Sequence, residues 1–179
     1  RGQTFPEDVC FHFEVGADLF QPRFLALLAT APPGLIQIEA GLQSFCEKTL
    51  EAVDRKTDLA VLTENLRQCI RPQNVHVHID LIAGLPYEDY DTFAASFNSA
   101  FALRPHMLQL GFLKLLYGSK LRRQAETRAE FGYRFSELAP YEVQQTRWLS
   151  PGDLAKLHEV EDALERMYNS GRFLQTIDY

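Results

Sequence analysis

The stretch HVHIDLIAGLPYED, residues 76 to 89, decides the fold class of this 179-residue chain. Its first half alternates between polar and apolar residues, which predicts a β-strand, because successive side chains of a strand point to opposite faces. The polar positions are His76, His78 and Asp80. A parallel strand buried on both faces would be apolar throughout. One face of this strand is therefore expected to meet water, paired charges or a ligand.

Three other segments alternate in a similar way, and each is followed by a helical pattern. A strand followed by a helix, repeated four times, predicts a parallel sheet with right-handed crossovers. The predicted strands are CFHFEV (10–15), LIQIEAG (35–41), VHVHIDLIA (75–83) and MLQLGFLKLL (107–116). Helices are predicted at 21–31, 44–55, 57–70 and 90–103, and from residues 119 and 150 onward.

The polar faces of these strands carry Glu14, Glu39, Asp80 and Gln109. An open sheet covered by helices on both sides needs two apolar faces, so the pattern favours a curled sheet with a polar interior and sites at the carboxyl ends of its strands. The predicted fold class is α/β: a partial TIM-like (β/α) barrel of about four parallel strands with flanking helices and a C-terminal helical extension. The predicted parts are a barrel portion, residues 1–130, and a helical extension packed on it, residues 131–179.

The composition excludes several classes of protein. A formal net charge of −6 argues against a nucleic-acid-binding surface. No apolar run approaches the roughly 18–20 residues of a membrane helix, and no signal peptide is recognisable, so we expect a cytoplasmic protein. The three cysteines, Cys10, Cys46 and Cys69, are far apart and show neither CxxC nor CxxxCxxC spacing. They are expected to be reduced thiols rather than ligands of a metal.

Three segments together resemble the radical S-adenosylmethionine (radical SAM) enzymes, in particular the group related to oxygen-independent coproporphyrinogen oxidase and to B12-binding radical SAM proteins. They are GLQSF (41–45), Arg55 and DLIAGLPYED (80–89). In addition, FHFEV (11–15) is similar to the segment of the family's third strand, and LQLGFLKLLYGSKL (108–121) to that of its sixth. The likeness runs from about residue 10 to about residue 125.

The resemblance implies a role for each matching residue. Gln43 and Asp80 match positions that bind the ribose hydroxyls of S-adenosylmethionine, and an amide with a carboxylate can satisfy a vicinal diol. Arg55 matches the position that holds the methionine carboxylate, for which a guanidinium fork is well shaped. Glu14 matches an acid near the methionyl end of the ligand. Gly84 matches the turn where the backbone approaches the adenine.

The resemblance has one large gap, because the family's CxxxCxxC motif, whose thiolates hold a [4Fe-4S] cluster, is absent. We therefore expect a C-terminal fragment of a radical SAM iron–sulfur oxidoreductase. Such a fragment would contribute the ribose, adenine and carboxylate half of the S-adenosylmethionine site and be inactive alone. The resemblance places the cluster, and a cobalamin where one is used, in the full-length protein only. No catalytic residue and no metal ligand is assigned to this chain.

The missing part of the barrel also bears on the partners. Without the preceding strands, the first strand of this chain would have an open edge of unpaired amides. We expect the edge to form a homodimer or to be covered by the C-terminal segment. An unidentified small molecule is the expected substrate, and neither nucleic acid nor a membrane is expected as a partner.

Two alternative interpretations use the same residues differently. His76, His78 and Asp80 are spaced like ligands of a metal-dependent hydrolase barrel, in which His-x-His on a strand binds zinc or iron. Against it, the other three of the five histidines do not fall at the carboxyl end of another strand. The second alternative is a noncatalytic scaffold domain, in which Gln43, Arg55 and Asp80 would have no role.

Overall fold

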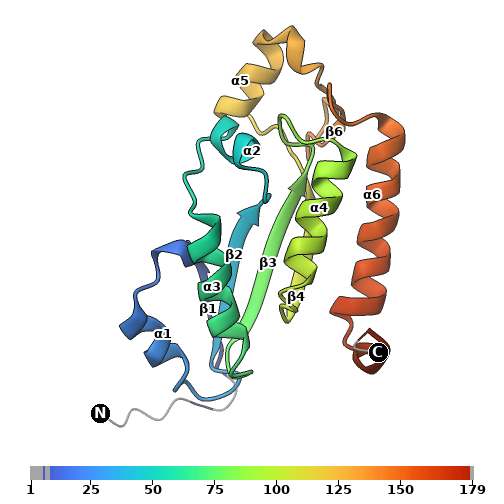
Figure 1. Ribbon diagram of the computed structural model, residues 1–179. Helices are drawn as coiled ribbons and strands as arrows, with labels where there is room; N and C mark the ends of the chain where they lie inside the picture. The colour runs from blue at the N-terminus through green and yellow to red at the C-terminus, as the bar shows by residue number, and fades with distance from the viewer. Residues whose placement is uncertain (1–5, 7–8, 178–179) are drawn as a thin grey trace.

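The computed structural model of the chain describes residue 6 and residues 9–177. Its centre is one sheet of four parallel strands in the order β1-β2-β3-β4 (Figure 1). Neighbours in this sheet are also consecutive in the sequence, as in a (β/α) barrel. The strands are β1 (Phe11–Val15), β2 (Ile36–Gln43), β3 (His76–Ala83) and β4 (Met107–Phe112).

Helices connect the strands and cover one side of the sheet. In the view of Figure 1, α3 and α4 lie in front of the strands, and α6 lies beside α4. The α-helices are α1 (Pro22–Leu28), α2 (Glu47–Ala52), α3 (Leu59–Ile70), α4 (Tyr90–Phe101), α5 (Lys120–Thr127), α6 (Pro151–Leu164) and α7 (Leu174–Ile177). Shorter helical segments are η1 (Ala17–Leu19), η2 (Ala129–Phe131) and η3 (Glu165–Asn169). None of the described helices combines the length and apolar character needed to cross a membrane.

This architecture confirms the predicted α/β class and the partial barrel of four parallel strands. Element ends differ by a few residues. The largest difference is at β4, which stops at Phe112, whereas the sequence pattern predicts a strand to residue 116. Beyond Phe112 the chain pairs instead with the C-terminal part: the Leu113 carbonyl accepts from the Val143 amide at 2.9 Å, and the Leu115 amide donates to the Tyr141 carbonyl at 3.0 Å.

Side-chain caps fix where several helices begin. Asp58 accepts a hydrogen bond from the Val61 amide and so caps α3, as the sequence predicts. Ser150 forms the predicted cap of α6 and completes a capping box with Asp153. Each cap satisfies backbone amides that have no partner inside the helix.

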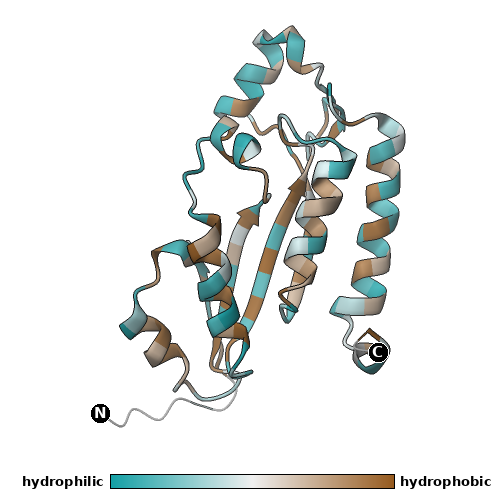
Figure 2. Ribbon diagram, viewed as in Figure 1, coloured by the Kyte–Doolittle hydropathy of each residue, from teal (hydrophilic) through white to brown (hydrophobic). Residues whose placement is uncertain are grey.

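The core lies between the sheet and its helices. Figure 2 shows alternating apolar and polar bands along β3, where Val77, Ile79 and Leu81 have no exposed surface. Phe93 of α4, with no exposed surface, packs in the same cluster as Ile79 and Leu81 of β3. The period of two in the strand and the spacing of apolar residues in the helices thus produce a single core.

The first strand departs from the expected pattern. The alternation of FHFEV predicts that Phe11 and Phe13 face the helices, but they are 39% and 49% exposed. Within the described chain, β1 pairs only with β2 and forms the edge of the sheet. The apolar face of β1 is therefore covered less than the apolar faces of β2 and β3.

The C-terminal residues lie across the carboxyl ends of the strands. A short antiparallel pair, β5 (Arg134–Phe135) and β6 (Val143–Gln145), sits above β3 in Figure 1. The Tyr133 hydroxyl donates to the Gly84 carbonyl at 3.0 Å, which ties this segment to the end of β3. The predicted domain division between residues 130 and 131 stays a prediction.

Candidate functional site

A cavity of about 410 Å³ opens at the carboxyl ends of β1, β2 and β3, within the size range of small-molecule sites. Its polar lining includes three acids, one amide and one guanidinium. The lining residues are Glu14, Val15, Gly16, Glu39, Gly41, Gln43, Arg55 and Asp80. Four of the five residues that the resemblance singles out thus share one cavity, although they come from separate segments of the chain.

The end of β2 shapes one wall of the cavity. The pairing register with β3 shifts between Gly41 and Gln43, and Gln43 has a φ of 72°, which is uncommon for a residue other than glycine. A Cβ added to Gly41 would lie 2.8 Å from Nε2 of Gln43. Any residue other than glycine at position 41 would therefore push the side-chain amide of Gln43 away from where it lies. The Arg55 Nη1 donates to the Gly41 carbonyl at 2.6 Å, which holds the guanidinium at the same wall.

Gly84 is not at the cavity. It has a φ of 96°, which suits glycine, but the space beside its Cα is filled by Leu113 and Val143. Its carbonyl accepts the hydroxyl of Tyr133. In this structure Gly84 therefore supports the contact between β3 and the C-terminal segment, and its predicted place beside an adenine stays a prediction.

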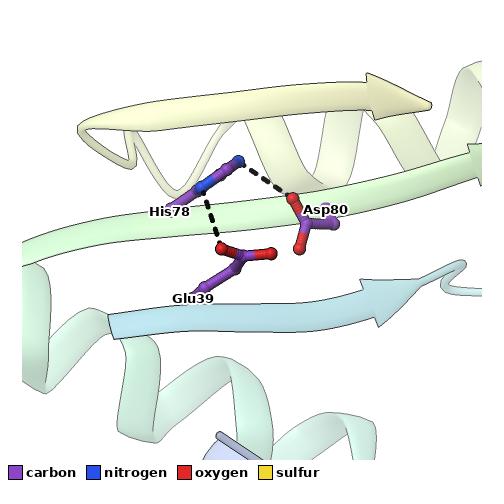
Figure 3. A group of neighbouring side chains, drawn as sticks. All are labelled: Glu39, His78 and Asp80. Atoms are coloured by element: carbon purple, nitrogen blue, oxygen red, sulfur yellow. Dashed lines mark ion pairs between the residues drawn. The ribbon is translucent and has the colours of Figure 1, made fainter. Parts of the chain in front are cut away.

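The polar face of the sheet carries an ion-pair ladder formed by His12, Glu39, His78 and Asp80. His12 Nε2 lies 2.8 Å from Glu39 Oε2, and the same carboxylate oxygen lies 3.7 Å from His78 Nδ1. On its other side, His78 Nε2 lies 2.9 Å from Asp80 Oδ1 (Figure 3). The ladder therefore runs across β1, β2 and β3 and ends at the cavity wall.

His78 sits between two carboxylates and is only 5% exposed. Burial lowers the pKa of His78, but the hydrogen bond and the charge of Asp80, together with the charge of Glu39, outweigh it, and the net pKa is raised. Both acids therefore favour the protonated form of the imidazole. His78 Nε2 and Asp80 Oδ1, which lie 2.9 Å apart, are both buried, and the described residues offer neither atom another partner.

The same arrangement bears on the metal-hydrolase interpretation. Glu39, His78 and Asp80 are close enough to hold an ion, with their ligand atoms within 4.8 Å of one another. Both imidazole nitrogens of His78, however, already face a carboxylate oxygen, and protonation, which these acids favour, removes the lone pair that a metal would need. His76, which that interpretation also requires, is turned to His106, with ring centroids 5.2 Å apart. The geometry therefore favours an ion-pair ladder over the predicted His-x-His metal site.

Replacing His78 by leucine should destabilise the fold by about 1–3 kcal/mol at pH 6, because two carboxylates would face each other without a cation. A His with a raised folded pKa stabilises fully below the unfolded value of 6.5 and loses that stabilisation as the pH rises through the folded pKa. The difference between wild type and variant should therefore shrink at alkaline pH in thermal unfolding. His158→Leu is the control, since that side chain is 45% exposed. An equal loss in both variants would contradict the ladder.

The structure reveals one functional candidate that sequence reasoning assigned differently. An acid just before a helix, as Glu88 is in the sequence, is expected to favour the helix start. In the structure Asp89 caps α4, and Glu88 has no exposed surface. Its Oε1 accepts hydrogen bonds from the hydroxyls of Ser44 at 2.6 Å and Ser96 at 3.0 Å. Burial raises the pKa of Glu88 to about 7. Neither the GLQSF segment around Ser44 nor the GLP segment before Glu88 carries a sequence signal that predicts this contact.

The three cysteines do not fit an iron–sulfur cluster. Cys10 precedes β1 and is exposed, Cys46 precedes α2, and Cys69 is buried in α3. Burial raises the pKa of Cys69 to about 11, whereas cluster ligands are thiolates. Within the described residues, no cysteine belongs to a group of possible metal ligands.

Comparison with solved structures leads to radical SAM enzymes. Coproporphyrinogen III oxidase (HemN) from Escherichia coli, a radical SAM enzyme, matches with a TM-score of 0.61 and 20% identity over 89% of this chain and 32% of that one. TsrM from Kitasatospora setae, a radical S-adenosylmethionine methyltransferase solved with cobalamin and a [4Fe-4S] cluster, matches with a TM-score of 0.64 and 14% identity, over 88% and 37% of the two chains. Archaeal Elp3 from Methanocaldococcus infernus matches with a TM-score of 0.54 and 16% identity, over 66% and 28%.

These likenesses confirm the predicted resemblance at the level of the fold. The chain spans about a third of the length of the structures it matches. A family described as a protein of unknown function (DUF4080) matches residues 129–179, which contain β5, β6 and α6. No curated protein matches the sequence.

Proposed function

We propose that this chain, which has the fold of part of a radical SAM barrel, contributes one side of an S-adenosylmethionine site within a longer protein. One observation carries the proposal: Gln43, Arg55 and Asp80, together with Glu14, line a single cavity at the carboxyl ends of neighbouring strands. A scaffold domain gives no reason for these side chains to converge.

The cavity offers a matching group for each polar part of the ligand. The amide of Gln43 and the carboxylate of Asp80 can donate to and accept from the two ribose hydroxyls. The Arg55 guanidinium, held by the Gly41 carbonyl, can bind the methionine carboxylate. Glu14 and Glu39 place negative charge at the same cavity, which suits a ligand with a sulfonium and an ammonium group.

The iron–sulfur cluster of a radical SAM enzyme supplies the electron that cleaves S-adenosylmethionine. The cysteines of this chain do not fit that cluster, so we place its ligands outside residues 1–179. The chain's own part is to bind and orient the nucleoside and the amino-acid group.

Equilibrium binding of S-adenosylmethionine to the full-length protein tests the proposal. We expect saturable binding of one ligand per chain, and competition by S-adenosylhomocysteine, which keeps the ribose and the carboxylate. Absence of binding in protein with an intact cluster would contradict the assignment of the cavity. Binding that survives simultaneous loss of the Arg55 and Asp80 side chains would place the ligand elsewhere.

The substitution Gly41→Ala tests the role of Gln43 in the same binding measurement. The new Cβ would lie 2.8 Å from Nε2 of Gln43 and 3.6 Å from the guanidinium of Arg55, so the flexible amide must move. We expect affinity for S-adenosylmethionine to fall about tenfold while the unfolding temperature changes little. Gly152→Ala in α6 is the matched control, because only Ser150 Oγ lies near it, at 3.7 Å. Unchanged affinity in Gly41→Ala would contradict the role of Gln43.

A further inference from the structure

A buried polar cluster lies directly behind the cavity wall that carries Gln43. It consists of Ser44, Glu88 and Ser96, each at most 2% exposed. These residues come from the β2–α2 connection, the β3–α4 connection and the body of α4, respectively. The cluster therefore joins three segments that meet at the carboxyl end of the sheet.

The hydrogen bonds of this cluster have a definite direction. Both hydroxyls donate to Oε1 of Glu88, so their oxygens are left to accept backbone amides. The Ser96 oxygen accepts from the Phe45 amide at 3.1 Å, and the Ser44 oxygen accepts from the Cys46 amide at 2.8 Å. One carboxyl oxygen thus orients two hydroxyls, and these hold the backbone that follows Gln43.

The backbone held in this way is the Gln43 loop, residues 43–46. Its first residue has a left-handed φ of 72°, a conformation that persists only where the surroundings impose it. The loop then enters α2 at Cys46, whose own side chain makes no capping hydrogen bond. The contacts from Ser44 and Ser96 are therefore important anchors of this loop.

We propose that Glu88 is a positioning residue: through Ser44 and Ser96 it fixes the Gln43 loop, and its ionisation loosens that loop. The inference rests on the proposed function in one respect, because it takes Gln43 to contact the nucleoside. Glu88 itself does not line the cavity. It acts through the loop, and so it couples the affinity of the cavity to pH.

The surroundings of Glu88 explain why its charge matters. The two hydroxyls lower its pKa, whereas burial and the charge of Asp89 raise it, and burial has the largest effect. Its second oxygen, Oε2, is buried without a hydrogen-bond partner, and no ion pair joins it to a cation in the described part of the chain. The carboxylate formed above neutral pH therefore carries a poorly compensated buried charge, which favours opening the loop to water.

Two substitutions separate the charge of Glu88 from its hydrogen bonds. Glu88→Gln keeps an oxygen that can accept from both serines and cannot ionise, so it imitates the protonated state. Glu88→Ala removes the acceptor altogether. Glu51→Gln, the same change at an exposed position of α2, is the matched control.

In the full-length protein, S-adenosylmethionine affinity of the wild type should fall several-fold from pH 6 to pH 8. Glu88→Gln should keep the pH 6 affinity throughout, and Glu88→Ala should bind about tenfold more weakly at every pH. The Glu51→Gln control should follow the wild type. A profile in Glu88→Gln as steep as that of the wild type would overturn the proposal.

A second measurement does not need the ligand. Hydrogen exchange of the Phe45 and Cys46 amides should be faster in wild type than in Glu88→Gln at pH 8, and equal at pH 6. The chemical exchange rate cancels when both proteins are compared at the same pH.

If this difference is found but S-adenosylmethionine does not bind, the proposed function fails and the positioning role stands. If the ligand binds but the two proteins exchange equally at pH 8, the positioning role fails, and this comparison remains decisive even if Glu88→Ala does not fold.

Discussion

Replacing Asp80 by alanine is expected to weaken the binding of every adenosine-containing ligand, whereas replacing Arg55 is expected to weaken only ligands that carry the amino-acid carboxylate. Each loss should amount to about 1.5–3 kcal/mol, or roughly 10- to 150-fold, because each removes a hydrogen bond to a charged group. The measurement compares S-adenosylmethionine with 5′-methylthioadenosine, which keeps the ribose and the sulfur but lacks the carboxylate. Six affinities, those of the wild type and the two variants for each ligand, therefore assign the two residues to the two ends of the ligand.

Controls for this comparison come from the chain itself. Asp80→Asn keeps an oxygen beside His78 and should lose less affinity than Asp80→Ala. Arg55→Lys keeps the charge but not the planar fork, and it should recover little. Arg71→Ala, at the exposed end of α3, should bind like the wild type. Equal losses for both ligands in Arg55→Ala would show that Arg55 does not bind the carboxylate.

The largest loss of stability is expected for Phe93→Ala, at about 3–5 kcal/mol. Phe93 has no exposed surface and packs beneath β3 in the core, so the substitution leaves a cavity among Ile79 and its neighbours. Denaturant unfolding measures the loss. Phe13→Ala removes the same atoms from a side chain that is 49% exposed, and it should cost much less. Equal costs would contradict the difference in burial between these two side chains.

The fold could be predicted from the sequence because its main signals are local. The alternation around His78 and Asp80 distinguishes the two faces of a strand, and four repeats of strand and helix predict a parallel sheet. Asp58 and Ser150 marked helix starts correctly, since a cap depends on residues only three positions away. The gathering of Glu14, Glu39 and Asp80 followed from the rule that parallel strands present their carboxyl ends at one edge, whereas Gln43 and Arg55 were expected there only from the resemblance.

What the sequence did not reveal depends on contacts between distant segments. Glu88 meets Ser44 across 44 positions, and neither the acid nor the serine shows in its own neighbourhood that it will be buried. Likewise, nothing around Gly84 in the sequence indicates that Leu113 and Val143 pack beside its Cα. Phe13 is exposed because β1 lies at the edge of the sheet. The alternation of residues within a strand does not indicate which strands or helices pack beside that strand.

The ladder of His12, Glu39, His78 and Asp80 has a consequence for the evolution of this protein. Imidazoles and carboxylates alternate across three strands. A mutation that removes one of these side chains therefore leaves its neighbour without a partner of opposite character. Loss of the central imidazole should therefore be tolerated in homologues only when one of the flanking acids is lost as well. In an alignment of such homologues, these four positions should covary as a set, with net charge preserved even where the individual residues are not.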